Sequence, residues 1–206
     1  MGNPALADLK AFTNPQTLAI NQTIEVSSDF QEMLPGASLR RGTVGVLVGT
    51  PGSGATSLFF SLIATPSQRG NWIALVGLEN LGFASARGHG VELSRLVSVS
   101  CIQTDLAEVA SMMLDGFDIV AVRAPIDATK ARKLATKARN QKAVLIVLSN
   151  SDSRSLGWPV GSDFSIRVLR SIWKTDGMAM AAQRSLDVEV DSNKWVTRRT
   201  RLVADI

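Results

Sequence analysis

The chain has 206 residues, 45% of them hydrophobic, so one domain with small terminal additions is the natural expectation. It contains a single cysteine and a single histidine. These counts exclude an internal disulfide framework and a His/Cys zinc site, which needs roughly three or four such ligands. The formal net charge of +4 permits an acidic partner, nucleic acid included, but does not identify one.

Targeting signals are not evident. No window of about 18 apolar residues predicts a membrane span. The first ten residues lack the basic and apolar regions of a secretion signal. We therefore expect a cytoplasmic protein without a metal site. His89 lies between two glycines and is expected in a turn or on the surface, outside any catalytic role.

Residues 1–33 are expected to form a polar N-terminal arm with short helices. One helix is predicted over Ala5–Phe12. Another is predicted over Phe30–Leu34, capped by the side chains of Ser27–Asp29 and ended by Pro35-Gly36.

Strand and helix patterns then alternate through residues 34–150, which is typical of an α/β fold with a mostly parallel sheet flanked by helices. The predicted strands are Val44–Val48, Trp72–Leu78, Leu96–Val99, Phe117–Val122 and Ala143–Leu148. The predicted helices are Thr56–Ala64, which should stop near Pro66, then Phe83–His89, Leu106–Leu114 and Ala128–Gln141.

The pattern changes after Asn150. Apolar residues alternate at Phe164, Ile166, Val168 and Ile172, and further extended segments are predicted over Met178–Val190 and Trp195–Val203. Turns are predicted at Asp176-Gly177 and Asp191–Lys194. Residues 158–206 are thus expected to form an antiparallel meander on one edge of the sheet, within a single domain of residues 34–206.

A glycine-rich turn follows the first predicted strand. A phosphate-binding loop of the Walker A type reads G-x-x-x-x-G-K-[ST], and its lysine and hydroxyl serve the phosphates and magnesium. Here the spacing is kept, but the lysine position is alanine. The loop residues in question are Gly49, Gly52, Gly54, Ala55, Thr56 and Ser57. Because alanine supplies no charge, we expect a vestigial loop that connects strand to helix.

The position of the Walker B aspartate also points to a lost ATPase site. The predicted strand Phe117–Val122 carries Asp118 near its start and is followed by Arg123, where a Walker B strand would end in a magnesium-holding aspartate. We therefore expect no catalytic residues, no ATP hydrolysis and no cofactor, ATP included.

Several segments resemble the RecA ATPase core. Leu34–Gly42 with the glycine loop resembles its entry, and Gly90–Leu96 resembles its "G-V-D-x-x-x-L" segment. Leu78-Glu79-Asn80 resembles the strand end that carries the RecA catalytic glutamate. The resemblance covers roughly Leu34 to Leu148. It implies a RecA-like P-loop core in which Glu79 keeps its position but has no phosphate chemistry to serve.

Within that superfamily the chain is most similar to ImuA-type proteins of the actinobacterial branch. Ala131–Arg139 resembles their "A-R-x-L-A-x-x-A-R" helix, and Trp158-Pro159 with Asp163–Val168 resembles their "W-P…D-x-x-L-x-V" segment. The resemblance implies an accessory protein of SOS mutagenesis and translesion synthesis. Its implied partners are the Y-family-like polymerase subunit ImuB and, through it, an error-prone replicative-type polymerase and the sliding clamp. No long glycine-rich DNA-binding loop is evident, so strand exchange is not expected.

Two cationic segments are candidate surfaces for DNA or a partner. The predicted helix 128–141 and its end carry Lys130, Lys133, Lys137, Arg132, Arg139 and Lys142, and its apolar stripe should face the sheet. The last predicted strand carries Trp195, Arg198, Arg199 and Arg201. Alternatively, the charged face of the helix is simply solvated. The three tryptophans of the C-terminal third, Trp158, Trp173 and Trp195, would then pack the meander onto the core.

Two other functions stay open. One is a DNA-stimulated RecA-like ATPase in DNA repair that uses Arg40, Arg41 or another cation in place of the missing lysine. The other is a regulator of cell division or of the SOS response that kept the fold and binds a different protein.

Overall fold

The structure is a computed structural model that describes residues 22–34, 36–79, 81–150, 157–175, 182–192 and 195–204. Within these ranges, the apolar runs predicted as strands form the parallel part of one sheet. These strands are β3 (Val44–Val48), β4 (Ile73–Val76), β5 (Leu96–Val99), β6 (Ile119–Arg123) and β7 (Val144–Ser149). Nearly every residue of β3, β4, β6 and β7 is buried, as expected for strands covered on both faces.

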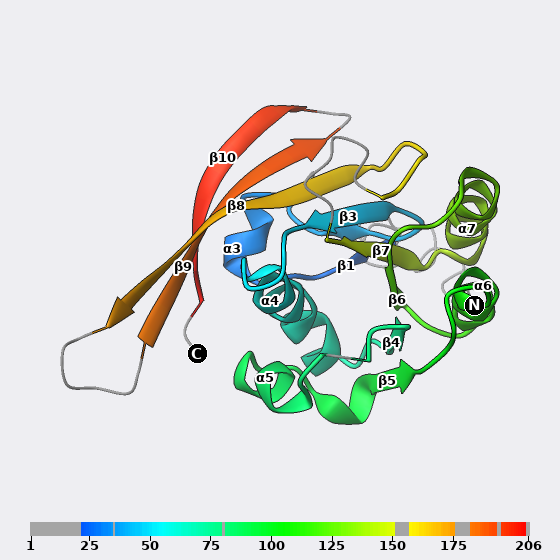
Figure 1. Ribbon diagram of the computed structural model, residues 1–206, viewed down its shortest axis with the longest axis horizontal. Helices are drawn as coiled ribbons and strands as arrows, with labels where there is room; N and C mark the ends of the chain where they lie inside the picture. Colours follow the sequence, from blue (N-terminus) through cyan, green and yellow to red (C-terminus); the bar gives the residue numbers. More distant parts are fainter. Residues whose placement is uncertain are drawn as a thin grey trace, which may run out of the picture.

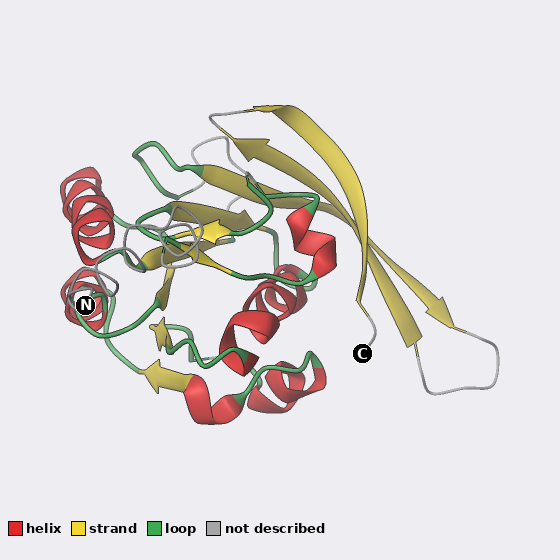
Figure 2. Ribbon diagram, turned by 180° about the vertical axis from the view of Figure 1, so that it is seen from behind, coloured by secondary structure: helices red, strands yellow, loops and turns green. Residues whose placement is uncertain are grey.

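Helices lie on both faces of this sheet, as Figures 1 and 2 show from opposite sides. They are α4 (Ala55–Gln68), α5 (Phe83–Gly88), the 3₁₀ helix η1 (Leu93–Arg95), α6 (Leu106–Met113) and α7 (Ala128–Gln141). Alternate strand residues point to opposite faces, so the protein has two cores. Leu47 and Ile146 pack with α4, whereas Val46 and Val147 pack with α6 and α7.

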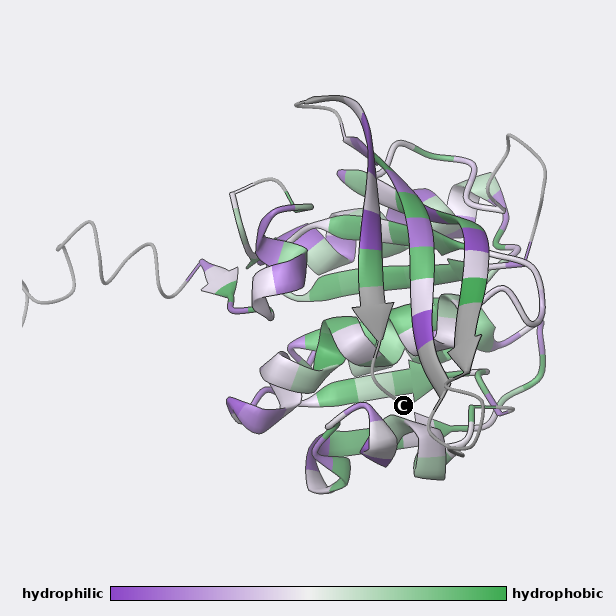
Figure 3. Ribbon diagram, turned by 90° about the vertical axis from the view of Figure 1, so that its left-hand side faces the viewer, coloured by the Kyte–Doolittle hydropathy of each residue, from purple (hydrophilic) through white to green (hydrophobic). Residues whose placement is uncertain are grey.

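The C-terminal segment extends the sheet as an antiparallel meander, as predicted. It consists of β8 (Phe164–Thr175), β9 (Ala182–Ser192) and β10 (Trp195–Ala204). The described residues form an eight-stranded sheet in the order β10-β9-β8-β3-β7-β6-β4-β5, in which β8 runs parallel to β3. Figure 1 shows the three long strands reaching past the core, and Figure 3 shows hydrophobic and hydrophilic residues alternating along them.

The described part of the predicted arm packs on this core. Strands β1 (Thr23–Ile24) and β2 (Leu39–Arg40) pair with each other, and α3 (Ser28–Gln31) lies between them in the chain. Ile24, Val26 and Phe30 are buried among the side chains around α4. The expected side-chain cap is wrong, because Ser27 occupies the N-cap position without a side-chain hydrogen bond. The predicted helix Ala5–Phe12 lies outside the described residues.

The predicted end of the first long helix is also wrong. α4 continues through Pro66 to Gln68. Pro66 has no N–H to donate to the Leu62 carbonyl, so it is disfavoured this far into a helix. The last turn closes without its N–H, since the Arg69 N–H donates to the Thr65 carbonyl. Pro66 is itself buried, which favours the helical position.

In the part of the chain that the structure describes, no helix has the length and apolar character needed to span a membrane. The described side chains also contain no group of three or more His, Cys, Asp or Glu arranged to hold a metal ion.

Candidate functional site

The glycine loop joins β3 to α4 at the carboxyl edge of the parallel strands. The Gly49 N–H donates to the Ser149 carbonyl at 3.0 Å, which ties the start of the loop to the end of β7. Gly54 is the N-cap of α4 and has a φ of 100°, a conformation that favours glycine. The loop therefore keeps the geometry of a strand-to-helix phosphate loop, with the N-terminus of a 14-residue helix facing the carboxyl edge.

A cavity of about 410 Å³ lies at this loop. The structure brings together all seven residues that the sequence singled out as a vestigial site. Its lining includes Gly49, Gly52, Gly54, Ala55, Thr56, Ser57 and Glu79. The end of β6 and the residue after β7 complete it with Arg123 and Asn150. The residues singled out by the loop spacing and by the RecA resemblance thus border one continuous concave surface.

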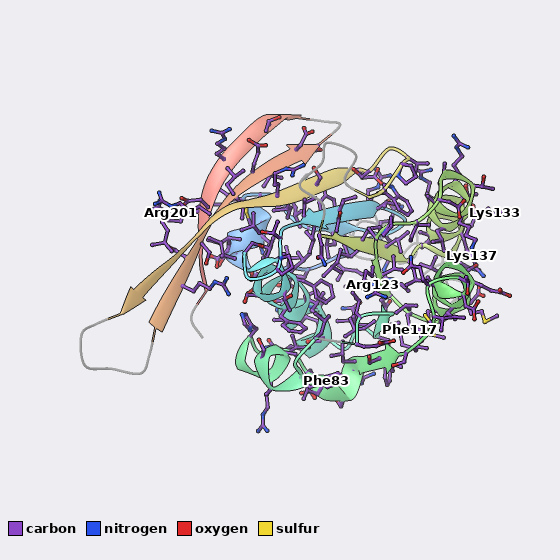
Figure 4. All side chains as sticks on the ribbon, in the orientation of Figure 1. Phe83, Phe117, Arg123, Lys133, Lys137 and Arg201 are labelled. Carbon is purple, nitrogen blue, oxygen red and sulfur yellow. The ribbon has the colours of Figure 1, made fainter. Side chains whose placement is uncertain are left out.

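Arg123 takes the position that an aspartate would occupy in a Walker B strand. It is the last residue of β6 and lines the cavity together with Ala55 and Glu79, and Figure 4 shows its side chain among the central elements. Asp118 lies at the opposite end of the strand, where its Oδ1 is 2.7 Å from Nη1 of Arg41. Asp118 and Arg41 therefore anchor the amino-terminal edge of the sheet, and neither reaches the loop.

A different cation reaches the loop. Arg184 of β9 is only 8% exposed and lines the cavity. Its Nη2 donates to the Gly52 carbonyl at 2.8 Å, and its Nη1 donates to Oγ of Ser57 at 3.4 Å. Its Nε donates to Oγ of Ser171 on β8 at 2.8 Å, which orients the guanidinium. Burial lowers the pKa of Arg184 from its ordinary value.

Sequence reasoning missed Arg184, although a signal was present. Leu186, Val188 and Val190 are the inward-facing residues of β9, and Arg184 is in phase with them. A strand of period two places such a residue on the core face. A charged residue among inward positions predicts either a strained strand or a buried polar partner. The glycine loop is that partner.

The thiol of Cys101 lies close to the same edge, 3.8 Å from the position that a Cβ on Gly77 would take. Burial is the main cause that raises the pKa of this thiol, followed by the negative charges of Glu79 and Asp105. Arg123 acts in the opposite direction. The thiol is therefore held in its neutral form.

The predicted basic helix is confirmed as α7, and its apolar stripe (Ala131, Leu134, Ala135 and Ala138) is buried against the sheet. Its cations are not equivalent. Nζ of Lys137 is 2.7 Å from Oδ2 of Asp115, and Nζ of Lys130 donates to the Thr104 carbonyl. Arg132 and Lys133 are exposed, as are Arg139 and Lys142 at the end of the helix.

β10 is an edge strand, and its arginines cross to β9. Nε of Arg199 is 3.0 Å from Oε2 of Glu189, and Nε of Arg201 is 2.6 Å from Oδ1 of Asp187. Arg198 is exposed on the same strand. The side chains of Trp195 and Trp173 lie outside the described part of the structure. Figure 4 shows Arg201 on the opposite side of the molecule from Lys133 and Lys137, so the two cationic segments form separate surfaces.

Trp158 and His89 take part in packing and in a turn. Trp158 is 4% exposed and belongs to the core beneath α6 and α7, which agrees with the packing interpretation. His89 follows α5, and its Nδ1 is 2.7 Å from the Ser85 carbonyl, as expected for a histidine at a turn.

Comparison with known proteins agrees with this architecture. A KaiC-like protein, PH0186, from the hyperthermophilic archaeon Pyrococcus horikoshii OT3 has a similar structure, with a TM-score of 0.59. The similarity covers 88% of this chain and 91% of that one at 14% sequence identity. An identity this low shows a shared RecA-like fold and nothing about activity.

A relative in sequence is the uncharacterized protein Rv3395c of Mycobacterium tuberculosis (strain ATCC 25618 / H37Rv). It is 36% identical over 113 residues, which make up 53% of this chain and 53% of that protein, so the match spans about half of each. The MT3502 N-terminal domain family matches residues 32–159, a range that contains the glycine loop and the five strands β3 to β7. On these grounds the chain belongs to the MT3502 N-terminal domain family, and it is built on a RecA-like fold.

Proposed function

We propose that this protein is a non-catalytic, RecA-like accessory subunit of damage-induced translesion DNA synthesis, of the ImuA type. In this proposal it binds a Y-family-like polymerase subunit, ImuB, and through it an error-prone replicative-type polymerase and the sliding clamp. One observation carries the non-catalytic part. The loop keeps its shape, but Ala55 stands in the lysine position and Arg123 in the aspartate position of the same cavity.

The chemistry of phosphoryl transfer explains why these two positions matter. Charge develops on the transferred group, and a lysine together with a magnesium ion held by a carboxylate normally stabilises it. Alanine offers no charge, and an arginine repels magnesium. Glu79 borders the cavity but has no activated phosphate to act on.

Phosphate release from ATP, measured with and without single-stranded DNA, tests the non-catalytic part. We expect no release above that of a protein-free control. Turnover that disappears in Glu79→Ala would overturn the proposal, because it would assign a catalytic role to that carboxylate. Glu108→Ala on the exposed face of α6 is the matched control for contaminating activity.

Co-purification after DNA damage tests the partner. We expect the polymerase-like subunit to be recovered with the tagged chain, and its reproducible absence counts against the accessory role. The exposed cations of α7 are the proposed DNA surface, because phosphates bind such side chains in a salt-dependent manner. β10 is the proposed partner surface, since an edge strand can accept a further strand.

A DNA-stimulated ATPase is the second candidate, and the burial of Arg184 at the glycine loop is the observation that favours it. Neither Arg40 nor Arg41 fits the role, because both precede β3 and Arg41 pairs with Asp118 at the far edge of the sheet. ATP-dependent filaments on single-stranded DNA would distinguish this candidate from the accessory subunit.

A further inference from the structure

We propose that the glycine-loop cavity binds the polyphosphate group of a ligand, and that Arg184 supplies the positive charge that Ala55 lacks. The inference goes beyond the accessory role, which requires nothing in this cavity. It also differs from the expectation that the loop binds no nucleotide, which rests on the missing charge at Ala55 alone. Arg184 lies outside residues 32–159, so the charge comes from a part of the chain that the family match does not include.

Arg184 is fixed at the loop from two directions. Its Nη2 donates to the Gly52 carbonyl inside the loop, and its Nη1 donates to the Ser57 hydroxyl in the first turn of α4. The guanidinium packs so closely that a Cβ on Gly54 would lie 2.9 Å from Nη2. A cation is therefore built into the wall of the cavity, next to the backbone that would wrap a phosphate.

Apart from Glu79, the rest of the cavity lining also suits an anion. The N-terminus of α4 faces it, and the unpaired N–H groups of a helix start attract negative charge. Arg123 lines it from the end of β6.

The size of the cavity also suits a small ligand. Its volume of about 410 Å³ lies within the range of small-molecule sites, roughly 300–1,000 Å³. Two cations, one helix N-terminus and a loop of backbone N–H groups converge there. Their shared preference is for a compact, multiply charged anion. A polyphosphate, free or carried by a nucleotide, is the chemical class that meets all of them.

Titration of the full-length protein with ATP, and separately with sodium tripolyphosphate, tests the proposal by calorimetry. We expect saturable binding and a loss of about tenfold or more in affinity for Arg184→Ala, since hydrogen bonds to charged groups are among the strong ones. The affinity of Arg184→Lys should fall between those of the wild type and Arg184→Ala, because lysine keeps the charge but not the forked geometry. Arg69→Ala, at the C-terminal end of α4 and paired with Glu25, is the matched control and should bind as the wild type does.

Binding of both probes assigns recognition to the polyphosphate alone. Binding of ATP only, with the same dependence on Arg184, assigns the ligand to nucleotides. No saturable binding of either probe at millimolar concentration overturns the proposal, as does a folded Arg184→Ala variant with wild-type affinity. Circular dichroism of each variant establishes that it is folded.

If Arg184→Ala does not fold, Ala55→Lys gives an independent test. A lysine added to the cavity wall should raise the affinity for tripolyphosphate by about tenfold, and an unchanged affinity contradicts an anion site. Phosphate release in the same samples reports on the proposed function separately. Hydrolysis would overturn the non-catalytic role and leave the role of Arg184 intact.

Discussion

Gly45 lies within β3, directly against the ring of Phe164 on β8. A Cβ at this position would overlap the ring, and β3 is fixed by parallel pairing with β7 on one side and β8 on the other. Overpacking of this kind costs about 1–3 kcal/mol. We expect Gly45→Ala to lower the free energy of unfolding by that amount, measured by urea denaturation.

Gly88→Ala is the control for this substitution. Gly88 ends α5 with open space around the position of a Cβ. Alanine favours a helix over glycine by up to about 1 kcal/mol, so this variant should be as stable as the wild type or more stable. Equal stability of Gly45→Ala and the wild type would mean that the contact with Phe164 does not fix the spacing of β3 and β8.

The reactivity of Cys101 reports on the same edge of the sheet as the glycine loop. Burial first, and Glu79 next, raise the pKa of this thiol, so the reactive thiolate forms only at higher pH than usual. The rate of alkylation by iodoacetamide should therefore have a midpoint above that of the same cysteine in denaturant. Glu79→Gln removes a negative charge and should lower the midpoint. A folded-state midpoint at or below the denatured value would contradict the environment described here.

At the residue scale, the success of sequence reasoning depended on distance along the chain. The local strand-and-turn pattern singled out the loop glycines and Ala55, the RecA resemblance singled out Glu79, and these residues line one cavity. Arg184 follows Gly52 by 132 residues, and their contact exists only because β9 folds back over α4. No local spacing encodes that contact.

Among the elements, α7 shows how a helix is specified locally. Oδ1 of Asp127 accepts hydrogen bonds from the N–H groups of Thr129 and Lys130, both at 3.0 Å. Loss of such a cap costs about 1 kcal/mol. We expect Asp127→Ala to lower the free energy of unfolding by that amount in a denaturant titration. Asp127→Asn should restore most of it, because asparagine caps nearly as well, and a failure of that rescue would assign the loss to another cause.

The same local signals explain which element boundaries were predictable. The bounds of α7 were predicted correctly, since an aspartate cap and a regular apolar stripe define its start and its inward face. α4 exceeds its predicted end, because a buried Pro66 near the C-terminus stays within the helix. In β8 the pairing register shifts between Val168 and Arg170, and Leu169 is left 45% exposed. Strict alternation does not predict a bulge, which depends on the partner strand.

At the scale of the whole molecule, the sequence indicated the layers but not the order of the strands. Alternating strand and helix patterns are sufficient for a parallel sheet with helices on both faces. The position of β8 beside β3 depends on long-range packing, such as the contact between Phe164 and Gly45. That placement brings Arg184 to the loop. It also separates the arginines of β10 from the cations of α7 (Figure 4).

This separation gives the proposed DNA surface a direct test. If DNA binds along α7, Lys133→Ala should weaken binding and reduce the slope of log affinity against log salt by roughly 0.7, the value for one phosphate contact on a single strand. Lys137→Ala should have a smaller effect, since Nζ of Lys137 already lies 2.7 Å from a carboxylate oxygen of Asp115. Fluorescence anisotropy with single-stranded DNA over a range of salt concentrations measures both. Arg199→Ala on β10 is the control and should leave the slope unchanged. An equal loss in Arg199→Ala and Lys133→Ala would place the DNA elsewhere on the molecule.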